Sequence, residues 1–305
     1  MLALLAPGQG SQTPGFLSPW LEDKNAAERI GTWSDAIGLD LTRLGTTADA
    51  DEIRDTANAQ PLLVAGGLIG ALRLFGIDLS AISYVAGHSV GEITAAAIAK
   101  VISEFDAMRF VNDRANAMST AASLEKTGMF AVLGGEREEV LDAMLKLGLV
   151  AANDNGAGQI VAAGLISELS LFADNPPAGA RIRPLAVAGA FHTRYMQSAQ
   201  EVLTKSAATI SPSDPTASII SNRDGFAVVD GEEVLERIIS QVANPVRWDL
   251  CMKSLQELGV TGVIELAPAG TLVGLLKRAA PEIETFAFKS PADLAAASEF
   301  AEKHK

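Results

Sequence analysis

The sequence predicts an α/β fold with a mainly parallel sheet and a smaller, ferredoxin-like subdomain inserted into it. Short apolar runs of the strand type alternate with helical stretches along almost the whole chain of 305 residues, which is the order typical of parallel sheets. One stretch breaks this alternation and has the order strand, helix, strand, strand, helix, strand. That order is the signature of a ferredoxin-like subdomain.

The larger sheet is expected to form from short apolar segments that are separated by longer helical ones. The predicted strands are 2–6, 82–86, 218–221, 262–265 and 285–288. The predicted helices are 60–74, 91–100, 103–121, 192–208, 232–242, 248–258 and 271–278.

The segment that breaks the alternation is predicted to form strands at 129–133, 149–153, 159–163 and 181–187, with helices at 136–147 and 167–174. We therefore expect a small ferredoxin-like subdomain at residues 124–188. It would be inserted into a large catalytic domain made of residues 1–123 and 189–305, with entry and exit close together. The catalytic cleft would then lie between the two.

Composition and charge exclude several classes of function. A net charge of −13 argues against binding nucleic acid, which selects basic surfaces. No apolar run approaches the roughly 20 residues that span a bilayer, and the N-terminus resembles a first strand more than a signal peptide. The single cysteine, Cys251, excludes an internal disulfide and is consistent with a reducing cytoplasm, and we expect it to pack in the core. No cysteine or histidine spacing suggests a zinc site. We expect a cytoplasmic monomer.

The segment Gly87-His88-Ser89-Val90-Gly91 has the form of a nucleophile elbow. It follows an apolar strand and opens a helix, which is the context that a G-x-S-x-G motif needs. Glycines allow the backbone to turn sharply, and the helix N-terminus places positive partial charge near the reacting oxygen. Ser89 is therefore the candidate nucleophile, and the backbone N–H of Val90 is the candidate oxyanion donor.

A serine hydroxyl needs an adjacent base, and the chain has only three histidines. His304 is expected in the polar C-terminal tail, and His88 precedes the serine, so its side chain should point away from Ser89. His192 remains by elimination.

Two further features suggest a binding site for an anionic substrate. The loop 7–12 follows the first strand at the carboxyl end of the sheet, where α/β folds bind ligands, and Gln9 could supply a second oxyanion N–H. Arg114 falls within the apolar stripe of the predicted helix 103–121 and needs an anionic partner there. An arginine that reaches a surface carboxylate is the alternative.

Taken together, these motifs resemble malonyl-CoA:acyl-carrier-protein transacylase, the acyltransferase of bacterial fatty-acid synthesis. They span nearly the whole chain in that family's order. The matching segments are Pro7-Gly8-Gln9-Gly10-Ser11-Gln12, Gly87-His88-Ser89-Val90-Gly91-Glu92, Arg114, Gly128-Met129, Ala190-Phe191-His192 and Asn244-Pro245-Val246.

The resemblance implies an α/β-hydrolase-like core with an inserted ferredoxin-like subdomain, and a residue-by-residue assignment of the site. Ser89 would be the nucleophile and His192 the base, oriented by a backbone carbonyl near Val246 or Arg247 and by no acid. Arg114 would bind the malonyl carboxylate. Gln9 and Val90 would then form the oxyanion hole.

The implied reaction is a ping-pong transfer of malonyl from malonyl-CoA through an ester on Ser89 to the phosphopantetheine thiol of acyl carrier protein, without metal or cofactor. The carrier could belong to fatty-acid or polyketide synthesis. Phe191 is expected to crowd a methyl branch, which favours malonyl over methylmalonyl. A serine esterase or thioesterase with the same elbow remains the alternative, because Asp154 or Asp174 could complete a triad.

Overall fold

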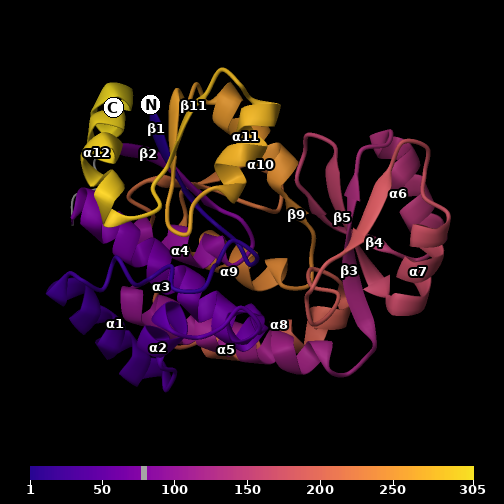
Figure 1. Cartoon of the computed structure of the whole chain (residues 1–305), viewed down its shortest axis with the longest axis horizontal. Coiled ribbons are helices and arrows are strands. Elements are labelled where there is room, and N and C mark those ends of the chain that lie inside the picture. The colour runs from indigo at the N-terminus through magenta and orange to yellow at the C-terminus, as the bar shows by residue number, and fades with distance from the viewer. Residues whose placement is uncertain (77–80) are drawn as a thin grey trace.

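The chain has an α/β fold with two mixed β-sheets, each covered by helices, that lie side by side (Figure 1). The computed structural model describes residues 1–76 and 81–305. The larger part holds both termini, and the smaller part is formed mainly by the middle of the chain.

The larger sheet has the strand order β11-β10-β1-β2-β7-β8. All neighbouring strands in it are parallel except β8, which is antiparallel to β7. The five strands that the sequence predicted for this sheet are therefore present. The strands are β1 (Leu2–Ala6), β2 (Ile82–Gly87), β7 (Ser218–Ile220), β8 (Ala227–Val228), β10 (Gly262–Glu265) and β11 (Glu284–Ala287).

Helices cover both faces of this sheet, as the alternation along β1 illustrates. Leu2 and Leu4 point into one core, and Ala3 and Leu5 point into the other. Successive side chains of a strand leave on opposite faces, so a strand buried on both sides must be apolar throughout. The helices on the first face include α3 (Thr56–Phe75), α4 (Gly91–Ile98), α5 (Glu104–Ala122), α8 (Gln197–Ala207) and α9 (Gly231–Gln241), and those on the second are α10 (Trp248–Glu257) and α11 (Thr271–Ala279).

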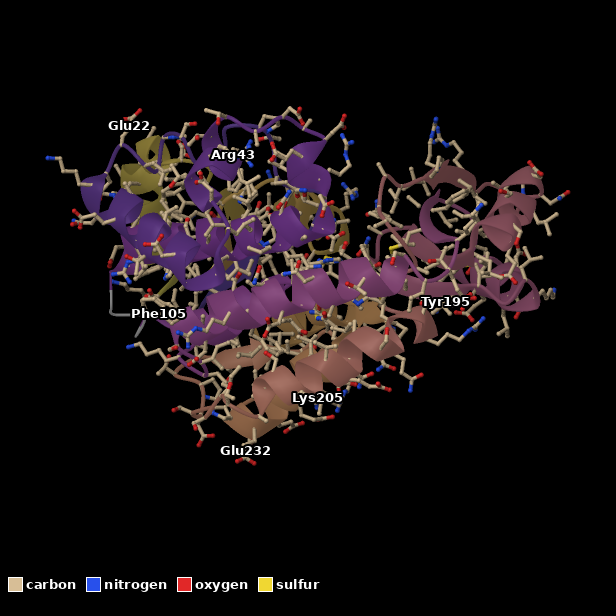
Figure 2. The ribbon with its side chains drawn as sticks, turned by 90° about the horizontal axis from the view of Figure 1, so that it is seen from below. Glu22, Arg43, Phe105, Tyr195, Lys205 and Glu232 are labelled. Carbon is tan, nitrogen blue, oxygen red and sulfur yellow. The ribbon has the colours of Figure 1, made fainter. Side chains whose placement is uncertain are left out.

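Helices α5 and α8 run side by side on the underside of the molecule (Figure 2). Tyr195 lies at the end of this pair that is nearest the smaller part, and Phe105 lies toward the other end. The start of one predicted helix shifts here. The predicted helix 192–208 begins only at Gln197, after a short 3-10 turn at Arg194–Met196, because His192 has a left-handed backbone (φ 60°) that no α-helix continues through.

Among the described residues, three α-helices were not predicted from the sequence. They are α1 (Lys24–Ile37), α2 (Leu41–Thr46) and α12 (Leu294–His304). Helix α1 begins at a strong N-cap, Asp23, whose side chain accepts two backbone N–H groups, and it buries only Ile30 and Trp33. Such a thin apolar stripe is a weak helical signal in the sequence.

The smaller sheet has the order β6-β3-β5-β4-β9. Its first four strands are antiparallel neighbours, and they alternate with two helices in the predicted order of elements. The elements are β3 (Thr127–Leu133), α6 (Arg137–Lys146), β4 (Val150–Asp154), β5 (Gln159–Leu165), α7 (Ile166–Asp174), β6 (Arg181–Pro184) and β9 (Val246–Arg247).

Two features of the smaller sheet differ from the prediction. Strand β6 ends at Pro184, earlier than the predicted 187, although the N–H of Leu185 still donates to the carbonyl of Met129 on β3 (2.9 Å). Strand β9 was not predicted and comes from the larger part of the chain, where it pairs in parallel with β4. The two sheets are thus tied together by a strand that crosses between them.

Helix α3 is the one helix, among the described residues, that is long and apolar enough to cross a membrane by length and composition alone. Most of its apolar stretch, 72%, is buried inside the protein. It packs against α5 and α4 and is therefore a core helix.

The turn between β2 and α4 needs glycine at two positions. A Cβ at Gly91 would lie 2.2 Å from the carbonyl oxygen of Ala6, and one at Gly87 would lie 1.9 Å from the carbonyl carbon of Gly91. These approaches hold the start of α4 against β1. Gly31 in α1, by contrast, has no atom within 4 Å of an added Cβ.

We predict opposite effects of alanine at these two positions. Gly91→Ala should lower the free energy of unfolding by at least about 1–3 kcal/mol through overpacking. Gly31→Ala, in the interior of α1, should raise it by about 1 kcal/mol, the difference in helix propensity. Urea denaturation of both variants measures this, and a Gly91→Ala variant as stable as the wild type would contradict the close approach.

Candidate active site

Ser89 lies at the tip of a sharp turn between β2 and α4. Its backbone has φ 53°, in the left-handed region that non-glycine residues rarely occupy. Such strain is tolerated where the surrounding structure enforces it, and it is typical of functional sites. The predicted elbow is therefore present in the structure, with the serine side chain turned toward a cleft.

The serine hydroxyl contacts His192. Ser89 Oγ lies 2.7 Å from His192 Nε2, and His192 Nδ1 lies 2.9 Å from the carbonyl oxygen of Gln241. A carbonyl only accepts, so Nδ1 carries the hydrogen and Nε2 is free to accept from the serine hydroxyl. The two residues that the sequence singled out, more than one hundred positions apart, are thus at hydrogen-bond distance.

The resemblance implied an orienting carbonyl in the Asn-Pro-Val segment, near Val246 or Arg247. The backbone of Asn244 in that segment does raise the pKa of His192, but the carbonyl at hydrogen-bond distance lies just before the segment. The acceptor belongs to Gln241, the last residue of α9. Carbonyl groups in the last turn of a helix have no partner within the helix and are available to other donors. The Arg247 side chain instead pairs with Asp249, with N···O distances of 2.8 and 2.7 Å.

Burial governs the protonation of the histidine. His192 is 3% exposed, and its pKa is lowered to about 3, first because burial disfavours the charged ring and then because of the nearby positive charge of Arg114. The imidazole is therefore neutral at physiological pH, the form that a general base requires.

Arg114 is a fully buried cation that is held by neutral groups. Its Nη1 donates to Gln60 Oε1 (2.6 Å), and its Nη2 donates to Gln241 Oε1 (3.0 Å) and to Ser89 Oγ (3.3 Å). Its Nε, among the residues that the structure describes, has no partner. Burial lowers the pKa of Arg114 to about 10, which leaves it charged. The alternative prediction, an arginine that reaches the surface, is wrong.

Four residues of the site were not assigned a role from the sequence. Gln60 and Gln241, which bind Arg114, are two of them, and Asn222 and Glu92 are the others. Asn222 follows β7 and accepts the backbone N–H of Ser89 on its Oδ1 (2.8 Å), while its Nδ2 donates to the carbonyl of Gly87 (2.8 Å). Glu92 is 2% exposed and accepts the backbone N–H of Asn222 on Oε1 (2.6 Å). The sequence signal for Glu92 was its position as the one charged residue of an otherwise apolar helix.

A cleft of about 360 Å³ opens over Ser89 between the two sheets. Gln9 and Val90 line it, and within the described chain their backbone N–H groups make no hydrogen bond, so both are free to donate to a ligand. Phe191 lines the same cleft beside His192 and is 6% exposed. The smaller sheet contributes Met129, Asn153 and Val161 to the opposite wall, and the segment after β6 contributes Leu185 and Val187.

The other two histidines lie elsewhere. His88 contacts Asn155 (Nε2···Oδ1 2.9 Å) and packs edge-on against Trp248. Its side chain therefore points away from the Ser89 hydroxyl, as predicted. His304 is not in an exposed tail but is buried at the end of α12, where its Nδ1 lies 3.0 Å from Thr261 Oγ1. In the described ranges no three His, Cys, Asp or Glu side chains gather as metal ligands.

The acyl transferase domain family matches residues 4–295 of the chain. Malonyl CoA-acyl carrier protein transacylase of Mycobacterium tuberculosis is 51% identical over 300 residues, which cover 96% of this chain and 98% of that protein. A crystal structure of MCAT from the same species superposes with a TM-score of 0.94 at 51% identity, covering 98% of this chain and 99% of that one.

A further solved structure contains a type II PKS acyl-carrier protein in complex with its malonyl-transacylase. It superposes with a TM-score of 0.91 at 29% identity and covers 98% of this chain and 99% of that one. Because the family match and the identity extend over nearly the whole chain, the chain belongs to the acyl transferase domain family, among the malonyl CoA-acyl carrier protein transacylases.

Proposed function

We propose that the chain transfers the malonyl group of malonyl-CoA to the phosphopantetheine thiol of an acyl carrier protein, through an ester on Ser89. The observation that carries this proposal is the contact of Ser89 Oγ with both His192 Nε2 and Arg114 Nη2. A nucleophile paired with a neutral base and placed beside a buried cation suits an acyl group that bears a carboxylate.

In the first half-reaction the Ser89 hydroxyl gives its proton to His192 Nε2, and Oγ attacks the thioester carbonyl. The tetrahedral oxyanion is held by the N–H groups of Gln9 and Val90. Collapse breaks the C–S bond, and the coenzyme A thiolate leaves with the proton from His192. The carrier thiol then loses its proton to His192 and attacks the ester, and the serine recovers its proton.

Arg114 binds the malonyl carboxylate in this proposal. Its hydrogen-bond partners in the free protein are amides and a hydroxyl, so no protein carboxylate among its bonded partners competes for the guanidinium. Phe191 narrows the cleft beside the base and disfavours a methyl branch. The reaction uses no cofactor and takes place in the cytoplasm, with a monomer as the active species.

The esterase or thioesterase alternative is disfavoured by the partner of His192. A Ser-His-Asp triad needs a carboxylate on Nδ1, whereas that atom contacts the Gln241 carbonyl. Asp154, one of the two candidate acids, is paired with Arg137 instead, at 2.9 Å. Free malonate release, measured against transfer to the carrier, separates hydrolysis from transfer.

We further propose that the larger part is an α/β-hydrolase-like core and that residues 124–188 form a ferredoxin-like subdomain. The antiparallel order β6-β3-β5-β4, with two helices between the strands in the sequence order βαββαβ, supports the second assignment. The parallel strand β9 at the edge is an addition from the larger part.

We predict that Ser89→Ala forms no malonyl adduct. His192→Ala should slow acylation by at least about 10³-fold, because the serine then lacks a base. Intact-mass spectrometry after mixing with malonyl-CoA follows the adduct, and circular dichroism checks the fold. A normal adduct on Ser89→Ala would place the nucleophile elsewhere.

Replacement of Arg114 by alanine should reverse the preference between malonyl-CoA and acetyl-CoA. Loss of one partner of a desolvated charge pair costs about 2–5 kcal/mol, roughly 30-fold to several thousand-fold in malonyl transfer. Acetyl transfer should hold or rise, because acetyl has no carboxylate to pair. Single-turnover acylation rates with both thioesters test this, and an equal fall in both would make Arg114 structural.

Carrier docking is expected to use basic side chains at the rim of the cleft, since carrier proteins are typically acidic and this chain carries −13. Arg181 and Arg183 are exposed on β6, directly before the cleft residue Leu185. The remaining candidates, all exposed, are Arg194, which stacks on Tyr195, and Lys277 and Arg278 on α11, a helix that also lines the cleft.

Arg183→Glu and Arg278→Glu should each raise the KM for the carrier without changing acylation by malonyl-CoA. Lys205→Glu is the matched control, because Lys205 lies along α8 away from the junction of the two parts (Figure 2). Unchanged carrier kinetics in both rim variants, or an equal effect in the control, would reject the docking surface.

A further inference from the structure

Glu92 is a buried carboxylate that the proposed mechanism does not use. It lies in the first turn of α4, three residues after the nucleophile, in a helix whose residues are all buried. A carboxylate with 2% exposure needs partners for both oxygens, because an unpaired buried charge is strongly destabilising. Each oxygen of Glu92 accepts from a different residue of the active site, Oε1 from Asn222 and Oε2 from Gln241.

The first oxygen supports the nucleophile. Glu92 Oε1 accepts the backbone N–H of Asn222 (2.6 Å). The Asn222 side chain then bridges the elbow, accepting from Ser89 N and donating to the carbonyl of Gly87, both at 2.8 Å. These hydrogen bonds through Asn222 hold the strained backbone at Ser89.

The second oxygen fixes the direction of an amide. Glu92 Oε2 is the charged acceptor of Gln241 Nε2, which also donates to the Ser89 carbonyl (3.3 Å) and to Asn222 Oδ1 (3.2 Å). Gln241 Oε1 accepts from Arg114 Nη2. A side-chain amide has a donor end and an acceptor end. Because the carboxylate takes the NH₂ end, the oxygen of Gln241 must face the guanidinium.

We propose that Glu92 is a positioning residue for the transfer reaction. Its carboxylate orients the Gln241 amide and so presents Arg114 to the acyl carboxylate, while its other oxygen holds the elbow of Ser89 through Asn222. This inference rests on the proposed function. Glu92 touches neither the substrate nor the reacting atoms. It acts through the side chains of Asn222, Gln241 and Arg114.

The charge around Glu92 makes this role sensitive to pH. Its pKa is raised to about 7, because burial outweighs the hydrogen bonds from Asn222 and Gln241 and the positive charges of Arg114 and Arg237. The other titratable groups around this network are His192, His88 and Cys251. The pKa of His192 is lowered to about 3, burial lowers the pKa of His88, and burial and the charge of Glu92 raise that of Cys251. Across neutral pH, Glu92 is therefore the group of this site that titrates.

The sign of the pH effect follows from the hydrogen bonds. Below about pH 7 Glu92 takes up a proton and no longer accepts on both oxygens, so Gln241 Nε2 loses its charged acceptor and keeps only the Ser89 carbonyl (3.3 Å) and Asn222 Oδ1 (3.2 Å). The kcat/KM for malonyl acylation should then fall about tenfold from pH 8 to pH 6, as the ionised fraction does. Titration of His192 contributes nothing in this range.

Glu92→Gln tests the inference with little change of shape. Its amide oxygen still meets the Asn222 N–H, but its NH₂ group now faces Gln241, whose amide must turn and direct its own NH₂ at Arg114. Acylation by malonyl-CoA should fall about ten- to a hundredfold, the range for a lost hydrogen bond to a charged group. Acylation by acetyl-CoA should fall much less, and the malonyl profile should become flat between pH 6 and pH 8.

Glu265→Gln is the matched control for the loss of a buried carboxylate. Glu265 is 0% exposed and accepts the backbone N–H groups of Gly270, Leu272 and Val273 at the start of α11, without contact to the catalytic pair. This control should lower Tm but leave the malonyl-to-acetyl ratio unchanged.

An equal fall with both thioesters in Glu92→Gln, or a pH inflection near 7 that survives in this variant, would overturn the positioning role. The wild-type protein separates this failure from that of the proposed function. If the wild type forms no malonyl adduct, the proposed function fails, whereas a normal wild-type adduct with an unchanged ratio in Glu92→Gln rejects the inference alone.

Discussion

The burial of the Arg114 guanidinium is the constraint on which the rest of the site depends. Taking a cation out of water is strongly unfavourable unless hydrogen bonds and a counter-charge offset it. Here the hydrogen bonds come from neutral amides, and the counter-charge, Glu92, is set back by one intervening amide, that of Gln241. The cation is thereby stabilised without being neutralised by direct contact, which leaves its charge available to an anion in the cleft.

The same charge acts on the base. Burial and Arg114 together lower the pKa of His192 to about 3, so in the free protein the histidine is a weak proton acceptor. An acyl carboxylate bound to Arg114 would cancel part of that positive charge and raise the proton affinity of His192. A diacid substrate would then strengthen the base that it needs, whereas a monoacid would not. If Arg114 binds the acyl carboxylate as proposed, one electrostatic interaction couples substrate choice to the strength of the base.

The part of the site that could be predicted from the sequence is the part that local chemistry specifies. The elbow around Ser89 needs glycines that allow a strand to turn into a helix, and this signal lies within five residues. Arg114 stood out because it interrupts an apolar stripe, and His192 because no other histidine was suitable. Likewise, most strands and helices were predicted, because apolar periodicity depends on neighbours in sequence.

The missed residues depend on contacts between distant segments. Asn222 reaches Ser89 only because β7 pairs with β2, and the Gln241 carbonyl reaches His192 only because α9 ends at that point. No periodicity within either segment indicates such a meeting. Helices α1 and α12 were missed for a different reason, because they bury few side chains and their apolar stripes are correspondingly weak.

The pairing of β9 with β4 holds the smaller sheet against the candidate active site. Strand β9 begins at Val246, five residues after Gln241, so the edge of the smaller sheet anchors the segment that follows the acceptor of His192. A second link, from His88 to Asn155, joins the elbow to the loop after β4. Both walls of the cleft are thus fixed within a few residues of Ser89 and of the Gln241 carbonyl that His192 contacts. A shift of one ångström between reacting groups can lower the rate by orders of magnitude. The two links therefore make the fold rigid where the position of the reacting groups matters most.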